Sequence, residues 1–258
     1  MTTADVTSRY ELRVLGPEHK AWAKALRIYS LIFNSPGWRA MYPDDLVART
    51  YKGFDALDGL ITHCIASGWT YGVFDTQYKP KHGGEGQLLW DFNNLEATEE
   101  QLLQQMDFPL VSIALSYDGY DPPLVNPQGL TLVIPAITEQ NKILNELDAR
   151  DPADWKPTGL RQVLMRNGTS TSPTYSGKGL MGRLARHLVD EARAAGFHAM
   201  QMRASSAAVL HVWENLPSPC RCEVISELTE DLGAAAEPLP SNSEARNFRI
   251  ARLWITLN

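Results

Sequence analysis

The sequence predicts a single mixed α/β domain that spans residues 1–258. Strand-like runs with alternating apolar residues and helix-like runs with helical apolar spacing follow one another along the chain. One strand-like run, Val163–Met165, leads through a glycine-rich turn into a helix-like run at residues 180–195. No repeat and no clean linker divides the chain, and its length suits one large domain.

The N-terminal third predicts two helices followed by a hairpin. Pro17 suits the first turn of a helix that ends near Phe33, and Pro43 begins a second, longer helix that ends near Gly68. Strands are expected at residues 11–15, 69–75 and 87–92. The segment 79–86 is rich in glycine and should join the last two of these strands as a hairpin.

The rest of the chain predicts an insertion and then a second alternation of strands and helices. An acidic helix, an apolar run of uncertain type at residues 108–115, a loop and a further helix suggest that residues 95–158 are inserted between two parts of one sheet. Beyond them we expect strands at residues 160–169, 197–203, 223–228 and 248–257, helices at 180–195 and 206–215, and a loop at 237–244.

Composition and charge argue against several classes of protein. The net charge of −6 disfavours a nucleic-acid partner and slightly favours a cationic small molecule. No run of about 18 apolar residues is present, so no membrane span is expected. Three cysteines are too few for a disulfide framework, and the polar start MTTADVTSRY lacks a secretory signal, so a cytoplasmic location is expected.

The turn at residues 173–182 has the chemistry of a phosphate site. Its glycines allow the backbone to approach a ligand closely. The helix that follows begins with N–H groups that have no acceptor within the helix, and the positive end of the helix dipole lies there. We therefore expect a phosphate-bearing ligand at residues 176–182.

Two other nucleotide motifs fit this turn less well. A P-loop needs Gly-Lys-Ser or Gly-Lys-Thr, but here Lys178 precedes Gly179 and no hydroxyl residue follows. Gly177, Gly179 and Gly182 do match G-x-G-x-x-G, but the following strand ends without the acid of a dinucleotide site. A dinucleotide-dependent oxidoreductase and a purely geometric role for the glycines stay open as alternatives.

The order strand, Pro-x-Tyr-x-Gly-x-Gly-Leu, helix, Gly-Phe, strand and helix over residues 160–216 resembles the GCN5-related N-acetyltransferases, the GNAT superfamily. The pattern also resembles uncharacterised fungal members of that superfamily. Tyr175 and Gly179 match the family turn, whereas Ser176 replaces its Gln or Arg and Met181 replaces its small sixth residue. The resemblance implies a mixed, splayed central sheet flanked by helices.

The resemblance further implies acetyl-CoA as co-substrate and direct transfer of its acetyl group to the amine of a small molecule. Backbone amides of residues 177–182 would hold the pyrophosphate, and the strand before the turn would pair with the pantetheine arm. The implied cofactor-binding residues are Thr169, Thr171, Ser176, Gly177, Lys178, Gly179, Leu180, Met181 and Gly182.

The resemblance also places the general acid in the helix after the next strand. The family often shows N-x-x-A-x-x-L-Y, in which the tyrosine protonates the departing thiolate. Here Ala207 and Leu210 match, Ala204 replaces Asn, and His211 replaces Tyr. An imidazolium donates protons near neutral pH, so His211 is the expected acid, with a merely structural histidine as the alternative.

The general base is not resolved, because the strand at residues 160–169 carries no acid. Candidates at strand ends, for which a turn or cap role is the alternative, are Asp75, Asp91 and Asp118. Four tryptophans either line an acceptor pocket or, more simply, pack in the core: Trp38, Trp69, Trp90 and Trp213.

No metal is expected, because Cys220 and Cys222 lack a second pair of ligands. The protein is expected to be a monomer or a homodimer. Two other functions stay open: O-acyl transfer or other acyl-CoA chemistry on the same fold, and a non-catalytic acyl-CoA sensor. The unusual Ser176 and Met181 are what suggest the sensor.

Overall fold

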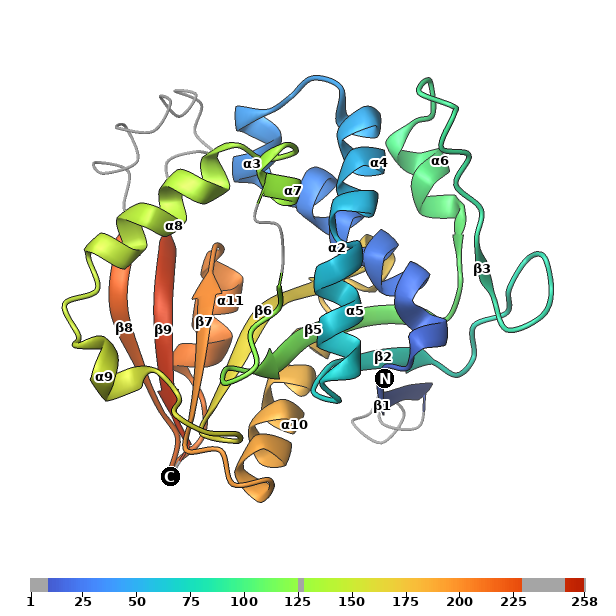
Figure 1. Ribbon diagram of the computed structural model, residues 1–258. Coiled ribbons are helices and arrows are strands. Elements are labelled where there is room, and N and C mark those ends of the chain that lie inside the picture. The colour runs from blue at the N-terminus through green and yellow to red at the C-terminus, as the bar shows by residue number, and fades with distance from the viewer. Residues whose placement is uncertain (1–8, 125–127, 229–248, 258) are drawn as a thin grey trace.

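The computed structural model describes residues 9–124, 128–228 and 249–257. Its centre is a seven-stranded sheet in the order β1-β2-β5-β6-β7-β9-β8 (Figure 1). The strands are β1 (Tyr10–Val14), β2 (Tyr71–Asp75), β5 (Leu110–Asp118), β6 (Val163–Thr171), β7 (Ala199–Ala204), β8 (Arg221–Leu228) and β9 (Ile250–Thr256). Every neighbouring pair is antiparallel except β6 and β7, which are parallel. The predicted mixed α/β class is confirmed.

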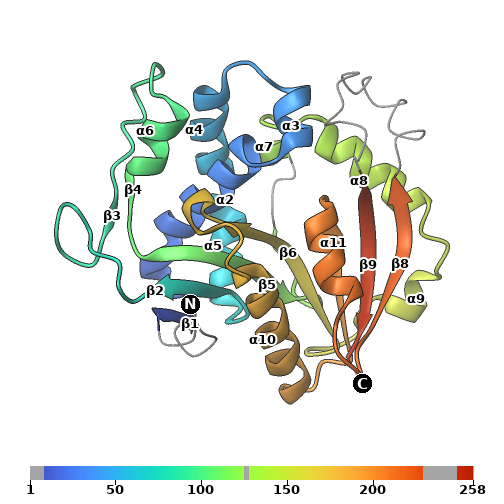
Figure 2. The same cartoon turned by 180° about the vertical axis from the view of Figure 1, so that it is seen from behind.

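Helices cover both faces of the sheet. The face in front in Figure 1 carries η1 (Pro17–His19), α2 (Lys20–Phe33), α3 (Pro36–Met41), α4 (Leu46–Ala56), α5 (Asp58–Ala66), α7 (Gln128–Thr131), α8 (Ala136–Glu146) and α9 (Pro152–Trp155). The opposite face, seen in Figure 2, carries α10 (Leu180–Ala194) and α11 (Ala207–Glu214). Helix α10 is amphipathic and buries Leu184, Leu188 and Val189, whereas α2 is buried along most of its length.

The long helix expected from Pro43 to Gly68 is two helices, α4 and α5. The second begins at Asp58, whose carboxylate pairs with Lys20 at 3.0 Å and Lys24 at 2.8 Å on α2. These contacts fix the start of α5 against α2. A tertiary interaction thus sets a boundary that local helix propensity does not show.

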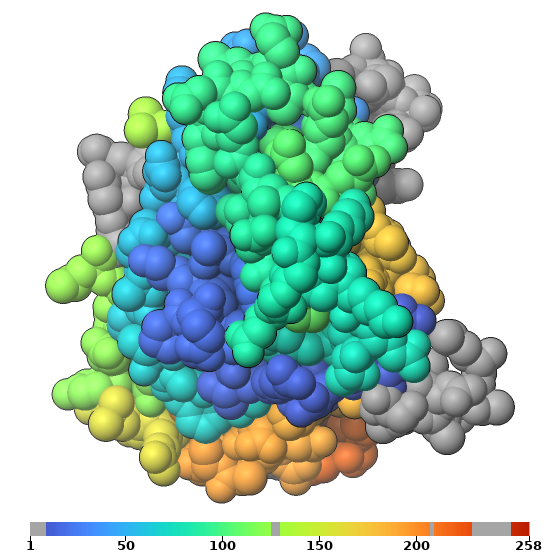
Figure 3. All heavy atoms as spheres, turned by 90° about the vertical axis from the view of Figure 1, so that its right-hand side faces the viewer, coloured from blue at the N-terminus to red at the C-terminus, as the bar shows by residue number. Residues whose placement is uncertain are grey.

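The predicted hairpin of residues 69–75 with 87–92 is wrong. Both edges of β2 are occupied, by β1 and β5, and the two-residue strand β3 (Gln87–Leu88) instead pairs with β4 (Met106–Asp107). The Asp107 carboxylate accepts hydrogen bonds from Tyr78 Oη and from the N–H groups of Lys81 and His82, which ties the intervening loop to β4. Together with α6 (Glu99–Gln104), this segment forms the teal and green face in Figure 3.

The range 95–158 is not inserted as a unit. It contains β5, which pairs with β2 on one side and β6 on the other. Helices α7, α8 and α9 lie between β5 and β6 in the chain. The other predicted strands and helices are present with ends shifted by a few residues, and the predicted loop at 237–244 lies outside the described residues.

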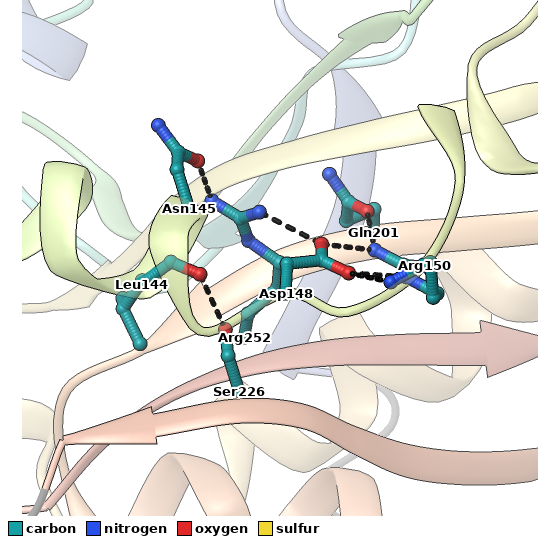
Figure 4. Close-up of polar contacts among 7 residues, drawn as sticks. All are labelled: Leu144, Asn145, Asp148, Arg150, Gln201, Ser226 and Arg252. Carbon is teal, nitrogen blue, oxygen red and sulfur yellow. Dashed lines mark hydrogen bonds and ion pairs between the residues drawn. The ribbon is translucent and has the colours of Figure 1, made fainter. Parts of the chain in front are cut away.

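Helix α8 is held over the β7–β9–β8 end of the sheet by buried polar contacts (Figure 4). The Asp148 carboxylate accepts hydrogen bonds from Arg150 at 2.9 and 2.8 Å and from Arg252 on β9 at 2.9 Å. Arg150 also donates to Gln201 on β7, and Ser226 Oγ donates to the Leu144 carbonyl at 2.8 Å. These contacts fix α8 beside α2 on the same face of the sheet.

Candidate active site

The sheet opens between its two parallel strands. Pairing of β6 with β7 runs from Val163↔Ala199 to Arg166↔Met202, but β6 continues to Thr171 with only β5 as a partner among the described strands. Asn167 is bulged out of the β5–β6 register, because Leu115 pairs with Gly168 and Ser116 with Arg166. Residues 167–171 therefore present a free strand edge to the gap.

The two threonines of the predicted pantetheine strand lie on this free part of β6. Thr169 Oγ1 accepts a hydrogen bond from Arg166 Nη2, and Thr171 Oγ1 is 2.7 Å from Ser112 Oγ on β5. Both side chains thus have partners within the protein. A ligand along this edge would be bound by the backbone, as β-strand addition requires.

The glycine turn follows β6 directly through η2 (Pro173–Tyr175) and leads into α10. Residues 176–179 are exposed, and Gly177 and Gly179 have φ of +74° and +71°, which favours glycine. A Cβ built on either glycine would meet nothing within 4 Å. Among the described residues the structure gives no acceptor to the N–H groups of residues 177–182, so they are available to an anion.

The remaining side chains of the turn have different surroundings. Leu180 is buried, and Met181 and Gly182 are half-buried. Lys178 is exposed, with Nζ 5.8 Å from the ring centroid of Tyr175. The open glycine face and the unbonded amides are the groups of this turn that could hold an anion such as a diphosphate.

Tyr175 links the turn to strand β2 of the sheet. Its hydroxyl donates a hydrogen bond of 2.9 Å to Asp75 on β2, which also binds Arg9 at 2.9 and 2.7 Å. Burial opposes ionisation of Asp75, but the hydrogen bonds from Arg9 and Tyr175 outweigh it and lower the pKa of Asp75. The carboxylate anchors the turn in its ionised form.

A cavity of about 660 Å³ lies between α2 and α8 and reaches the gap between β6 and β7. That volume suits a small molecule. Its lining includes residues 165–169 of β6 and residues 201–203 of β7, together with Val209 of α11. No aspartate, glutamate or histidine is among its lining residues in the described part of the chain.

In the described part of the chain, four arginines line this cavity: Arg27, Arg166, Arg203 and Arg252. Arg252 binds the Asp148 carboxylate, but the other three bind only neutral acceptors among the described residues. Sequence reasoning missed these residues. The available signal is that Arg27 interrupts the otherwise uncharged second half of its helix, and that Arg166 and Arg203 are the charged residues of otherwise uncharged strands.

His211 lies away from the cavity. Its imidazole is exposed on α11, with Nδ1 3.2 Å from the amide nitrogen of Asn215. Val209, which does line the cavity, is two residues earlier and so points to nearly the opposite side of the helix. The acid role of His211 stays a prediction, and the structure does not bring this side chain to the gap.

The three candidate bases all have structural partners. Asp75 binds Arg9 and Tyr175, and Asp118 accepts hydrogen bonds from backbone N–H groups at residues 120 and 161. Asp91 is exposed and accepts from the N–H of residue 93. None of the three lines the cavity. Asp91 and Asp118 thus make contacts typical of turn residues, which was the alternative, Asp75 ties two segments together, and the general base stays unresolved.

Of the four tryptophans, Trp38 lines the cavity, and the other three do not. Trp90 and Trp213 are buried in the two main clusters of apolar side chains, and Trp69 packs against Phe197. Among the described residues no group of three His, Cys, Asp or Glu side chains could hold a metal ion, and no helix is long and apolar enough to cross a bilayer.

No protein-family model and no curated protein matches the sequence. Solved structures do match. The chain is similar to the C-terminal condensation domain of Ebony in complex with β-alanyl-dopamine, at 13% identity over 95% of this chain and 98% of that one, with a TM-score of 0.63. It is also similar to arylalkylamine N-acetyltransferase 2 from Aedes aegypti, at 11% identity over 96% and 99% of the two chains, with a TM-score of 0.56.

The chain therefore has the fold of the GNAT acetyltransferases, as the turn at residues 173–182 led us to expect. Identities this low show the fold and leave substrate and activity to the chemistry of the site.

Proposed function

We propose that this protein transfers an acetyl group from acetyl-CoA to the amine of a small molecule by direct attack. The observation that carries the proposal is a convergence at one opening of the sheet. The free edge of β6 and the cavity between α2 and α8 meet at the gap between β6 and β7, and the turn with the unbonded amides of residues 177–182 follows the end of β6. A diphosphate, an extended arm and an acceptor thus each have a complementary surface.

The residues proposed to hold CoA are those of the turn and the strand before it. Amides 177–182, at the start of α10, would bind the diphosphate, and the backbone of Thr169 and Thr171 would pair with the pantetheine arm. Backbone N–H groups on the free edge would polarise the thioester carbonyl where charge develops on its oxygen.

Proton transfer needs an acid and a neutral amine. His211 is the proposed acid for the departing thiolate, although its imidazole is exposed outside the cavity lining. No carboxylate of the described residues lines the cavity to accept the proton of an ammonium. The nearby guanidinium groups instead favour the uncharged amine, because like charges disfavour a second cation.

Release of thiol from acetyl-CoA, measured with a panel of amines, tests the proposal. We expect thiol release that depends on the amine, and saturable CoA binding by calorimetry. Absence of CoA binding at millimolar concentration would remove the proposal altogether.

The absence of aspartate, glutamate and histidine from the cavity lining, in the described part of the chain, favours a second candidate function, a non-catalytic acyl-CoA sensor. A sensor would bind CoA and release no thiol with any amine or alcohol. Thiol release with alcohols alone would instead indicate O-acyl transfer on the same fold.

A further inference from the structure

We infer that the acceptor carries an anionic group, a carboxylate or a phosphate, and that Arg27, Arg166 and Arg203 bind this group in the cavity. The inference rests on the proposed function for the identity of the reaction, and on the cavity itself for the charge of the ligand. The net charge of the chain slightly favours a cationic ligand. The arginines that line the cavity instead favour an anionic ligand there.

Arg27 enters the cavity from α2 and lies against β6. Its guanidinium lies so close to Gly168 that a Cβ built there would be 2.9 Å from Cζ. Its contact with Ser170 Oγ is long, at 3.5 Å, and its buried Nε has no hydrogen-bond partner among the described residues. Donors of Arg27 are therefore free for a ligand beside the bulge of β6.

Arg166 lies at the last paired position of β6, where the gap begins, and is only 4% exposed. It donates to the Gly168 carbonyl at 3.1 Å and to Thr169 Oγ1, and no described residue is a partner for its buried Nε. Its Cζ lies 5.3 Å from the ring centroid of Trp213. All these partners are neutral, so no carboxylate of the described residues compensates its charge.

Arg203 reaches the cavity from β7, across the gap. Its two Nη atoms donate to the side-chain amides of Gln140 and Asn141 on α8, at 2.5 and 3.0 Å, and its Nε is buried without a partner among the described residues. Arg252 differs, because it shares Asp148 with Arg150. Among the described residues, three of the four arginines that line the cavity thus have no carboxylate partner, and Arg252 has one.

Holding three guanidinium groups together without an anion is costly. Burial lowers the pKa of Arg166 to about 9 and that of Arg27 to about 10, and the charge of Arg27 adds to the effect on Arg166. Burial lowers the pKa of Arg203 to about 10, with further contributions from Arg27 and Arg252. A bound anion would offset both the desolvation and the mutual repulsion.

The geometry of the donors matches a planar or tetrahedral oxyanion. A guanidinium presents a rigid fork of N–H groups, and such forks bind carboxylate and phosphate oxygens in pairs. The three forks come from α2, β6 and β7, so they surround the mouth of the gap. An amine tethered to the anion would then lie within the cavity volume of about 660 Å³.

The test compares amines that differ only in the anion: ethylamine with β-alanine, and ethanolamine with 2-aminoethyl phosphate. We expect kcat/KM for thiol release to be at least about tenfold higher for an acid-bearing member, because the plain amine leaves the guanidinium groups unpaired. The two pairs distinguish a carboxylate from a phosphate. Equal or better turnover of both plain amines would overturn the inference.

Substitution of single arginines tests which residues bind the anionic group of the acceptor. Arg27→Gln and Arg203→Gln should raise KM for the acid-bearing amine by about tenfold and leave the Kd for CoA unchanged. Arg221→Gln, on an exposed arginine of β8, is the matched control and should change neither value. Unchanged KM in both cavity variants, with folding verified by circular dichroism, would contradict the assignment.

Calorimetry without CoA separates this inference from the proposed function. Binding of β-alanine or 2-aminoethyl phosphate to the wild type, lost in Arg27→Gln, would support the anion site even if CoA did not bind. No heat with either acid at millimolar concentration would overturn the anion site, whatever the result with CoA.

Discussion

The guanidinium of Arg27 lies directly on the backbone of Gly168, so that a Cβ at this position would come 3.0 Å from Nη2 and 3.1 Å from Nε. Gly168 has no positive φ, so alanine fits its backbone. The side chain that must move is the flexible end of Arg27. Gly168 thus sets where Arg27 lies without itself binding a ligand.

Gly168→Ala should therefore displace Arg27 and weaken binding of the acceptor. We expect KM for an acid-bearing amine to rise about tenfold, with a loss of no more than about 1 kcal/mol in the free energy of unfolding. Gly59→Ala on α5 is the control, because nothing lies within 4 Å of its added Cβ. Steady-state kinetics and urea denaturation measure both effects, and an unchanged KM would contradict the role of Gly168.

Gly179→Ala should weaken CoA binding through the backbone. Gly179 has φ of +71°, so alanine there costs about 1 kcal/mol or more and shifts the amides of the turn. Gly68→Ala is a matched control, since Gly68 also has a positive φ, +76°, and an open Cβ position, but lies outside the turn. Calorimetry with CoA should show a higher Kd for Gly179→Ala alone; equal Kd values for both variants would remove the turn from the site.

Tyr175→Phe should loosen the same turn from β2. The variant leaves Asp75 with Arg9 but removes the hydrogen bond of 2.9 Å from the tyrosine hydroxyl. Hydrogen bonds to charged groups contribute about 1.5–3 kcal/mol, and partial exposure puts this one at the lower end. We expect a lower free energy of unfolding and a higher Kd for CoA. Tyr120→Phe, an exposed tyrosine, should change neither quantity.

The sequence predicts the turn well because its chemistry is local. Glycine spacing, the strand before it and the helix after it are adjacent in the chain, and the structure places Gly177 and Gly179 in the left-handed conformation that this turn requires. The run at residues 108–115 could not be assigned from sequence, since a short apolar run suits a buried strand or a buried helix. Pairing with β2 and β6 decides that residues 110–115 of this run belong to β5.

The arginine cavity could not be predicted from sequence, because it depends on contacts between elements far apart in the chain. The packing of α2 on β6 decides which groups surround Arg27. The position of α8 decides which groups surround Arg203. The orientation of His211 likewise depends on packing and could not be predicted from the sequence. Its helix is predicted, but burial of Leu210 and Trp213 decides that His211 points to solvent.

His211→Ala tests the proposed acid against a residue of the cavity. If the imidazole protonates the thiolate, turnover should fall about a hundredfold, with little change in the Kd for CoA. Tyr117 is the alternative donor, because it lines the cavity and burial raises its pKa to about 12, which keeps the hydroxyl protonated. Unaltered turnover in His211→Ala together with a loss in Tyr117→Phe would assign the proton to Tyr117.

Asp148→Asn should release α8 from the sheet in a pH-dependent way. Hydrogen bonds from Arg150, and then from Arg252, hold the pKa of Asp148 well below its ordinary value despite burial. A lowered folded-state pKa contributes stability that is present above the unfolded value of about 3.9 and lost as the pH falls through the folded value. At pH 7 the variant leaves two half-buried guanidinium groups without their carboxylate, which costs about 3–5 kcal/mol.

Urea denaturation at pH 7 and near pH 3 measures this contribution. The free energy of unfolding of Asp148→Asn should lie well below that of the wild type at pH 7, and the difference should shrink at the lower pH, where the wild-type contribution is being lost. Asp154→Asn, an exposed residue of α9, should match the wild type at both pH values. A constant difference between Asp148→Asn and the wild type would show that the loss comes from packing and not from ionisation of Asp148.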